Sequence, residues 1–260
     1  MSPAMRLQDR VAIITGAGQG IGKAYAARFL REGARVVIAE ASKERGEQAE
    51  AELSRDGEAV FVRTDVSDET SAEACARSVA DRFGRIDVLV NNAALFYDFD
   101  RTDDSFEYLL RVFRVNLHGM WLMARAVSPA MVERRFGRIV NVSSSAAYIH
   151  PSFDEPFAGV HSWGYNQTKW GVVGLTQFLA GQLGQYGVTA NCIAPGVTLS
   201  EATKKSLTPE RIEVLRAQSA LKRTLRPEDL TGAVVFFASD DAELVTGQVL
   251  CVDAGLCMPA

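Results

Sequence analysis

Short apolar or nearly apolar runs alternate with helix-like stretches along most of the chain. The runs are Val11–Ile14, Val60–Val62, Val88–Val90, Ile139–Val142 and Val249–Val252. Continuous runs of this kind are typical of strands buried on both faces of a sheet. Their alternation with helices indicates βαβ units. The pattern therefore predicts one α/β domain with a doubly wound parallel sheet, in which ligands bind beyond the carboxyl ends of the strands.

The first run leads directly into a glycine-rich turn. The segment from Thr15 to Gly22 reads TGAGQGIG, and apolar residues at helical spacing follow it. Backbone N–H groups at such a helix start can bind a pyrophosphate, because no side chains block its approach. The strict G-x-G-x-x-G motif fails here, since Ile21 occupies the third glycine position. A glycine-rich loop without a ligand is the alternative, but the strand–turn–helix context favours a Rossmann-like dinucleotide site.

The second predicted strand ends in an acid. Glu40 lies 18 positions after Gly22, close to the offset at which a carboxylate binds the adenosine ribose hydroxyls. It would also repel a 2′-phosphate. The glycine loop carries no cation, although Lys43 and Arg45 lie just beyond Glu40. We therefore predict NAD rather than NADP, against the alternative of an exposed acid at a strand end.

Tyr165 and Lys169 lie four positions apart, downstream of the serines at 143–145. In a helix these two side chains share one face, so the ammonium lies beside the phenol. A cation lowers the pKa of tyrosine from its usual value of about 10. The tyrosine can then exchange a proton with an alcohol or ketone near neutral pH. The spacing is common by itself and gains weight only beside the dinucleotide motif.

Composition excludes several other classes of function. The chain has 260 residues, 47% of them hydrophobic, which suffices for a full core. Its net charge of −4 argues against nucleic-acid binding. No apolar run reaches membrane-spanning length, and the N-terminus lacks a signal-peptide core. Scattered cysteines predict reduced thiols in a cytoplasmic protein, and the three histidines form no metal motif.

From about Leu7 to Gly255 the motifs, in their order, resemble the short-chain dehydrogenase/reductase family. The resemblance assigns catalytic roles to Asn116, Ser144, Tyr165 and Lys169. It implies cofactor contacts from Gly16, Gln19, Gly20, Ile21, Gly22, Glu40, Asp65, Val66, Asn92, Ala93, Tyr165, Lys169, Pro195, Gly196, Thr198 and Ser200. Asp65-Val66 is similar to the adenine-contacting pair, and Pro195-Gly196 to the turn beside the nicotinamide. No metal is implied.

Two departures from the family pattern stand out. Ala94 replaces the glycine that usually ends the Asn-Asn-Ala-Gly turn. The gap from Ser144 to Tyr165 is 21 positions, longer than the family's usual spacing. Its prolines and glycine predict an elaborated substrate loop over about 145–164. The sequence also predicts a helix over about Pro209 to Gln218. By resemblance, the surrounding segment at about 196–226 is a substrate lid; the alternative is an ordinary surface excursion.

These features together predict reversible oxidation of a secondary alcohol to a ketone by NAD. Tyr165 would be the general base in oxidation and the general acid in reduction. Lys169 would lower the pKa of Tyr165, and Ser144 would bond the substrate oxygen; Ser143 and Ser145 would support the turn. By resemblance, Asn116 would fix a helix kink and hold a proton-relay water.

Other functions remain open at this point. One is an NADPH-dependent 3-oxoacyl-carrier-protein reductase, which the acid at position 40 disfavours. A second is a non-catalytic dinucleotide sensor, since the fold alone does not imply activity. A third is an isomerase or dehydratase that retains bound NAD.

The substrate is a small molecule whose class depends on aromatic residues near the two loops. If they face the cleft, they suit an apolar cyclic or aromatic alcohol; otherwise they pack the loops. They are Phe96, Tyr97, Phe99, Tyr148, Phe153, Phe157 and Trp163.

The helix that carries Tyr165 continues with more apolar surface than one sheet face needs. The residues concerned are Val172, Val173, Leu175, Phe178, Leu179 and Leu183. By resemblance this helix contributes to a four-helix dimer contact, so we expect a homo-oligomer, either a dimer or a tetramer.

Overall fold

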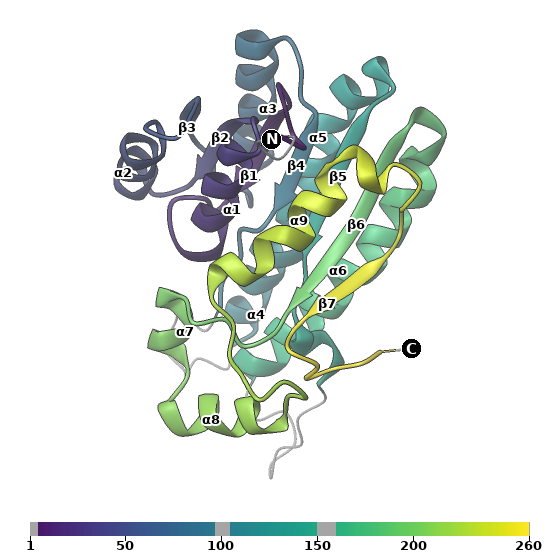
Figure 1. Ribbon diagram of the computed structural model, residues 1–260. Helices are drawn as coiled ribbons and strands as arrows, with labels where there is room; N and C mark the ends of the chain where they lie inside the picture. The colour runs from purple at the N-terminus through teal and green to yellow at the C-terminus, as the bar shows by residue number, and fades with distance from the viewer. Residues whose placement is uncertain (1–4, 97–104, 150–159, 260) are drawn as a thin grey trace.

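The computed structural model describes residues 5–96, 105–149 and 160–259. Within these ranges, seven parallel strands form one sheet in the order β3-β2-β1-β4-β5-β6-β7 (Figure 1). The strands are β1 (Val11–Thr15), β2 (Arg35–Glu40), β3 (Ala59–Arg63), β4 (Val88–Asn91), β5 (Gly137–Val142), β6 (Val188–Pro195) and β7 (Val249–Val252). The strand order reverses between β1 and β4, and ligands of open α/β sheets bind at such a point. The predicted doubly wound parallel sheet is confirmed.

Helices cover both faces of the sheet (Figure 1). On one face, α1 (Gly20–Arg31), α2 (Lys43–Leu53) and α9 (Thr231–Ala238) share a core cluster with Ile14. On the other, α3 (Glu69–Phe83), α5 (Gly119–Arg134) and α6 (Val160–Leu183) share a cluster with Ile13. Neighbouring residues of β1 thus enter opposite cores, which explains the uninterrupted apolar run.

The remaining elements are short helical segments between the main helices and strands. α4 (Phe106–Phe113) passes through a π-helical turn, η1 (Arg114–His118), into α5. α7 (Glu201–Ser206) and α8 (Pro209–Gln218) follow β6. The short 3₁₀ helices are η2 (Ser145–Tyr148), η3 (Gly184–Tyr186), η4 (Pro227–Leu230) and η5 (Asp240–Ala242).

The predicted substrate loop and lid differ in outcome. α6 already begins at Val160, inside the stretch expected to be loop, and η2 occupies its start. α6 contains no proline, so the helix can begin at Val160; residues 150–159 lie outside the described ranges. In the segment predicted to be a lid, α8 has the predicted bounds, and Thr208 caps it by accepting from the Arg211 N–H at 3.2 Å. α7 was not predicted.

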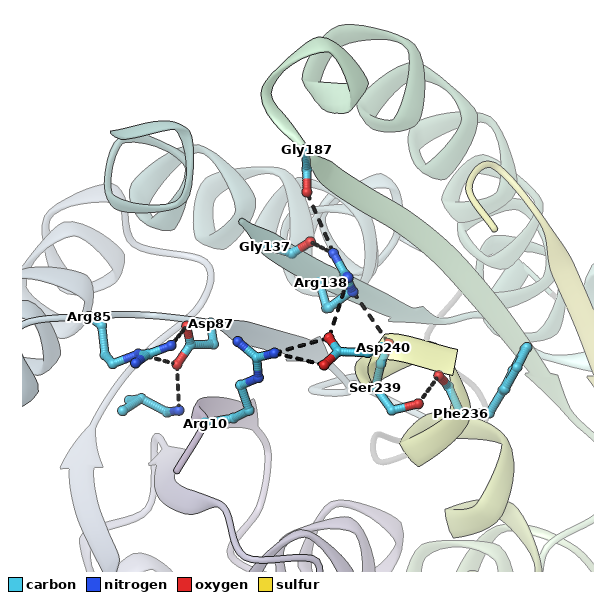
Figure 2. A network of polar contacts seen from close by, with 10 residues as sticks. Arg10, Arg85, Asp87, Gly137, Arg138, Gly187, Phe236, Ser239 and Asp240 are labelled. Carbon is cyan, nitrogen blue, oxygen red and sulfur yellow. Dashed lines mark hydrogen bonds and ion pairs between the residues drawn. The ribbon is translucent and has the colours of Figure 1, made fainter. Parts of the chain in front are cut away.

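A polar network holds the amino end of the sheet together (Figure 2). The buried Asp87 carboxylate accepts two hydrogen bonds from Arg85, both 2.7 Å, and one from the first N–H of β1 at 2.8 Å. Arg138 of β5 is also buried and lies 3.8 Å from Asp240. Arg10, just before β1, donates to the same carboxylate at 3.0 and 3.1 Å. These contacts join β1, β4 and β5 at the edge opposite the predicted site.

No helix in the described ranges is long and apolar enough to cross a membrane. The same residues contain no group of three or more His, Cys, Asp or Glu side chains that could hold a metal ion. All four cysteines are unpaired thiols.

Candidate active site

A cavity of about 760 Å³ lies at the carboxyl ends of the strands. Every residue predicted to bind the cofactor lines it, from Gly16 in the glycine loop to Ser200 before α7. Ser144, Tyr165 and Lys169 line the same cavity. The remaining predicted catalytic residue, Asn116, does not line it and is fully buried. Positions spread over most of the sequence therefore meet in one place.

The glycine loop forms a cradle in which side chains would not fit. Gly16 and Gly20 have φ angles of 64° and 55°, in the left-handed region that favours glycine. A Cβ atom at Gly22 would overlap the carbonyl oxygen of Gly16. Thr15 Oγ1 joins this cradle to β4, because it accepts from the N–H groups of Asn92 and Ala93 at 2.9 and 3.0 Å. Open backbone at the start of α1 fits the pyrophosphate of a dinucleotide.

Glu40 lies at the end of β2 in the cavity wall, with a side chain only 6% exposed. Its carboxylate accepts from the Gly18 N–H at 3.3 Å and from the Ser42 N–H at 3.0 Å. Arg45 Nη2 also donates to it, at 3.1 Å. Sequence spacing identified Arg45 only as a nearby cation, and the structure adds the direct ion pair.

Tyr165 and Lys169 lie on one face of α6, as their spacing predicts. The Lys169 side chain is buried, and its Nζ lies 5.5 Å from the centre of the Tyr165 ring. Nζ donates to the carbonyl oxygen of Val142 at 2.8 Å. Burial lowers the pKa of Lys169 to about 8. A buried cation is little screened by solvent, so it acts strongly on the adjacent phenol.

The three serines after β5 have different surroundings. Ser144 caps η2 and lines the cavity, and its Oγ accepts from the Ala146 N–H at 3.1 Å. Ser143 is buried and donates to the main-chain oxygen of Lys169 at 2.6 Å. Ser145 is buried as well. Ser143 thus anchors α6 to the strand, and Ser144 has the more accessible hydroxyl.

Asn116 lies in the π-helical turn between α4 and α5. Its Oδ1 accepts from the Leu95 N–H at 2.7 Å, and its Nδ2 donates to the Leu95 carbonyl at 3.0 Å. Nδ2 also lies 3.5 Å from Thr168 Oγ1 of α6. The side chain therefore fixes the segment after β4, whose Phe96 ring meets the Tyr165 ring edge-on at 4.9 Å. The family resemblance implied a helix kink and a proton-relay water at Asn116, but not this anchoring.

The aromatic residues expected around the substrate have different positions. Phe96 lines the cavity, whereas Tyr148 packs edge-on against Trp170, with ring centres 5.6 Å apart. Neither Tyr148 nor Trp163 is among the described lining residues. Tyr97, Phe99, Phe153 and Phe157 lie outside the described ranges. Of the three expected aromatic residues that the structure describes, only Phe96 therefore forms part of the cavity wall.

Several aliphatic lining residues were not singled out by the sequence analysis. They include Ile149, Leu207, Leu215 and Leu256. Nothing local indicates that Leu256, near the C-terminus, reaches the cavity.

Known proteins match nearly the whole chain. Residues 16–257 match a family model described as Enoyl-(Acyl carrier protein) reductase. An L-rhamnose 1-dehydrogenase (NAD(P)(+)) from Azotobacter vinelandii is 36% identical, covering 97% of this chain and 98% of its own. A D-threitol dehydrogenase from Mycolicibacterium smegmatis is also 36% identical, with coverages of 96% and 94%.

The solved structures give the same result. A levodione reductase superposes with a TM-score of 0.87 at 32% identity, covering 96% of this chain and 98% of its own. Together with the glycine cradle and the Tyr165–Lys169 pair, these matches show that the chain belongs to the short-chain dehydrogenase/reductase family of oxidoreductases.

Proposed function

We propose that this protein interconverts a secondary alcohol and its ketone with NAD as the cofactor. The observation that carries the proposal is the buried Lys169 ammonium, 5.5 Å from the Tyr165 ring centre, in a cavity shared with Ser144 and the glycine cradle. A non-catalytic dinucleotide sensor would not require this arrangement.

In oxidation, Tyr165 Oη accepts the proton of the alcohol, and in reduction the phenol returns it to the ketone oxygen. Lys169 stabilises the phenolate. Ser144 accepts one hydrogen bond and still has its own proton to donate, so it bonds the substrate oxygen. The nicotinamide, when bound, supplies the hydride transfer.

Asn116 is a positioning residue in this proposal. It holds Leu95, and through it the Phe96 ring that contacts Tyr165. Because its side-chain amide is already engaged, we infer that the main chain of the π turn, rather than this amide, holds the water that carries the proton to solvent.

Glu40 supports NAD over NADP. Its carboxylate is held at the cavity wall by three donors, where it can accept from ribose hydroxyls and repel a 2′-phosphate. This feature also speaks against the NADPH-dependent 3-oxoacyl-carrier-protein reductase, despite the wording of the family model.

The described walls favour an apolar cyclic or aromatic substrate. Phe96, Leu207 and Leu256 contribute apolar surface near Tyr165 and α8. Polyols and sugars are the second candidates, because the D-threitol and L-rhamnose dehydrogenases match nearly the whole chain.

A test compares alcohols and ketones of both classes with NAD and NADP by absorbance at 340 nm. We expect NAD-dependent oxidation, strongest for cyclic or aromatic alcohols. Tyr165→Phe should lower kcat by roughly 10²- to 10⁴-fold, the usual contribution of acid–base catalysis. Unchanged turnover in Tyr165→Phe would contradict the mechanism. A preference for polyols would contradict only the substrate class.

A further inference from the structure

The part of the cavity around Tyr165 is connected to α8 by a short series of contacts. The Tyr165 ring meets the Phe96 ring edge-on at 4.9 Å, and the Phe96 carbonyl accepts from Ser206 Oγ at 3.2 Å. Ser206 ends α7, directly before Leu207 and the start of α8. Two contacts therefore fix the amino end of α8 relative to the proposed general base.

The other end of α8 is connected to the serine turn after β5. The Ser145 carbonyl oxygen in this turn accepts from Cys257 Sγ at 3.6 Å. Two residues before that thiol, the Gly255 carbonyl accepts from the Ala220 N–H at 3.1 Å, just beyond the end of α8. Leu256, between these two contacts, lines the cavity. α8 is thus anchored to the site at both ends and lies beyond the carboxyl end of β6 (Figure 1).

One face of α8 forms part of the cavity wall. Arg211 and Leu215 lie one turn apart on the helix, Leu207 lies just before it, and all three line the cavity. Two aliphatic side chains therefore flank one guanidinium. Most of this wall suits an apolar group, whereas its centre suits an anion.

The charge of Arg211 is not used within the protein. Of the basic residues between positions 201 and 226, all of which the structure describes, only Arg211 lines the cavity. Its main-chain N–H donates to Thr208, but its guanidinium makes no hydrogen bond or ion pair with another described residue. Arg216 on the same helix instead donates to Glu213 at 2.7 Å and to the Lys222 carbonyl at 2.8 Å.

The acidic residues of the described cavity wall lie at other places. Glu40 ends β2 and Asp65 follows β3, on the adenosine side of the proposed dinucleotide site. Glu201 Oε2 lies beside the first turn of α1. Glu107 lies on α4 one turn before Arg111, a cation that lines the cavity as well. The face of α8 therefore adds a positive charge that none of these acids neutralises by an ion pair.

We propose that the substrate carries a carboxylate that Arg211 binds, while its carbinol or ketone carbon lies at Tyr165 and Ser144. The apolar side chains of the wall contact the part of the substrate between these two groups. A guanidinium binds a carboxylate through two parallel N–H···O bonds, and one cation suits one negative charge. This inference rests on the proposed function, because it names the substrate class of the same site.

Parallel series of acetophenones test this inference. One series carries a para carboxylate on a chain of zero, one or two methylenes, and the other consists of the corresponding methyl esters. With NADH, we expect kcat/KM for the acid of best length to exceed that of its ester by roughly 10-fold, as for a hydrogen-bonded ion pair. Arg211→Gln should remove this preference, and Arg211→Lys should keep part of it.

Lys205→Gln is the matched control. Lys205 lies exposed on the neighbouring helix α7 and does not line the cavity. Its replacement removes the same charge from the same surface, so the preference for the acid should stay within about twofold of the wild type. Thermal unfolding of each variant shows that the comparison is made between folded proteins.

Calorimetric titration of the same compounds into the protein with NAD⁺ separates this inference from the proposed function. A ketone and the oxidised cofactor cannot react, so the titration measures binding without turnover. Tighter binding of the acids that Arg211→Gln abolishes supports the inference even if no ketone is reduced, and the missing reduction then contradicts only the proposed chemistry. No binding of any acid, equal binding of acids and esters, or a preference that survives Arg211→Gln overturns the assignment of a carboxylate to Arg211.

Discussion

Lys169 affects both the proposed chemistry and the stability of the folded protein. Its ammonium is buried beside Tyr165 and donates a hydrogen bond to the Val142 carbonyl. Burial favours the neutral amine and lowers the pKa of Lys169 from 10.5 to about 8. In the proposed mechanism this cation activates Tyr165, and the protein holds it at a cost in folding free energy.

This cost predicts a pH dependence of stability. Between pH 8 and 10.5 the unfolded chain holds a proton on Lys169 that the folded chain has released, so the free energy of unfolding rises with pH. We expect the difference between Tyr165→Phe and Tyr165→Phe/Lys169→Met to be constant below about pH 8. Above it, the difference should change by up to about 3 kcal/mol in favour of the chain with Lys169.

Urea unfolding at pH 7, 8, 9 and 10 without cofactor measures this difference. The Tyr165→Phe background removes the neighbouring phenol as a second titrating group. A difference that does not change with pH would show that Lys169 keeps its ordinary pKa in the folded protein.

Individual site residues were predictable where a residue type suited to the site follows a predicted strand. Glu40, Ser144 and Pro195 lie at or just beyond strand ends, and parallel strands bring their carboxyl ends to one edge. The position of Leu256 was not predictable, because it depends on how the chain returns after β7. The orientation of Tyr148 depends on its contact with Trp170, which no local pattern records.

At the scale of elements, the approach of α1 to β1 depends on the absence of a side chain at Gly22. A Cβ atom there would overlap the Gly16 carbonyl oxygen and lie 2.6 Å from Asn92 Nδ2. We expect Gly22→Ala to destabilise the fold by about 1–3 kcal/mol, as overpacking does. It should also weaken NAD⁺ binding, because the cradle must widen.

Gly232→Ala in α9 is the matched control. No heavy atom beyond its neighbours lies within 4 Å of the added Cβ, so this helix should gain about 0.5–1 kcal/mol. Urea unfolding and NAD⁺ titration of both variants provide the measurement. Equal effects at the two positions would mean that α1 does not need the close approach.

The elements were also predictable to different degrees. Strands and α8 follow from apolar runs and from a capping threonine before proline. The π turn at Asn116 could not be derived from helical periodicity. The Asn116 side chain is hydrogen-bonded to the main chain of Leu95, which is distant in sequence. The first residue of α6 could not be predicted, because the segment before it is rich in proline and glycine and contains no clear helix-start signal.

At the scale of the whole molecule, α6 presents an apolar stripe to solvent. Val172 and Leu179 face the sheet, whereas Trp170 and Phe178 are 55% and 58% exposed. A Cβ at Gly174, between them, would meet no atom within 4 Å. Exposed aromatic surface of this kind is typical of contacts between proteins. We therefore propose that two copies pack together through α6.

Replacing Trp170 and Phe178 together by glutamate should dissociate this assembly. Buried aromatic residues at the centre of an interface typically contribute about 2 kcal/mol or more each, and two carboxylates would face their symmetry mates. Ala51→Glu, on exposed helix α2 at the opposite face of the sheet, is the control for added charge. Size-exclusion chromatography with light scattering should give the mass of one chain for the double variant and of a multimer for the control. A monomeric wild type, or a double variant with the wild-type mass, would contradict an interface through α6.

The proposed interface would also support the active site. The Trp170 ring contacts Tyr148 in the helical turn that follows Ser144, so a partner that packs on Trp170 would hold this turn in place. Because Trp170→Glu removes that contact directly, the test is Phe178→Glu alone, which keeps it: dissociation by this variant should lower kcat as well as mass, and the loss should be absent from Ala51→Glu.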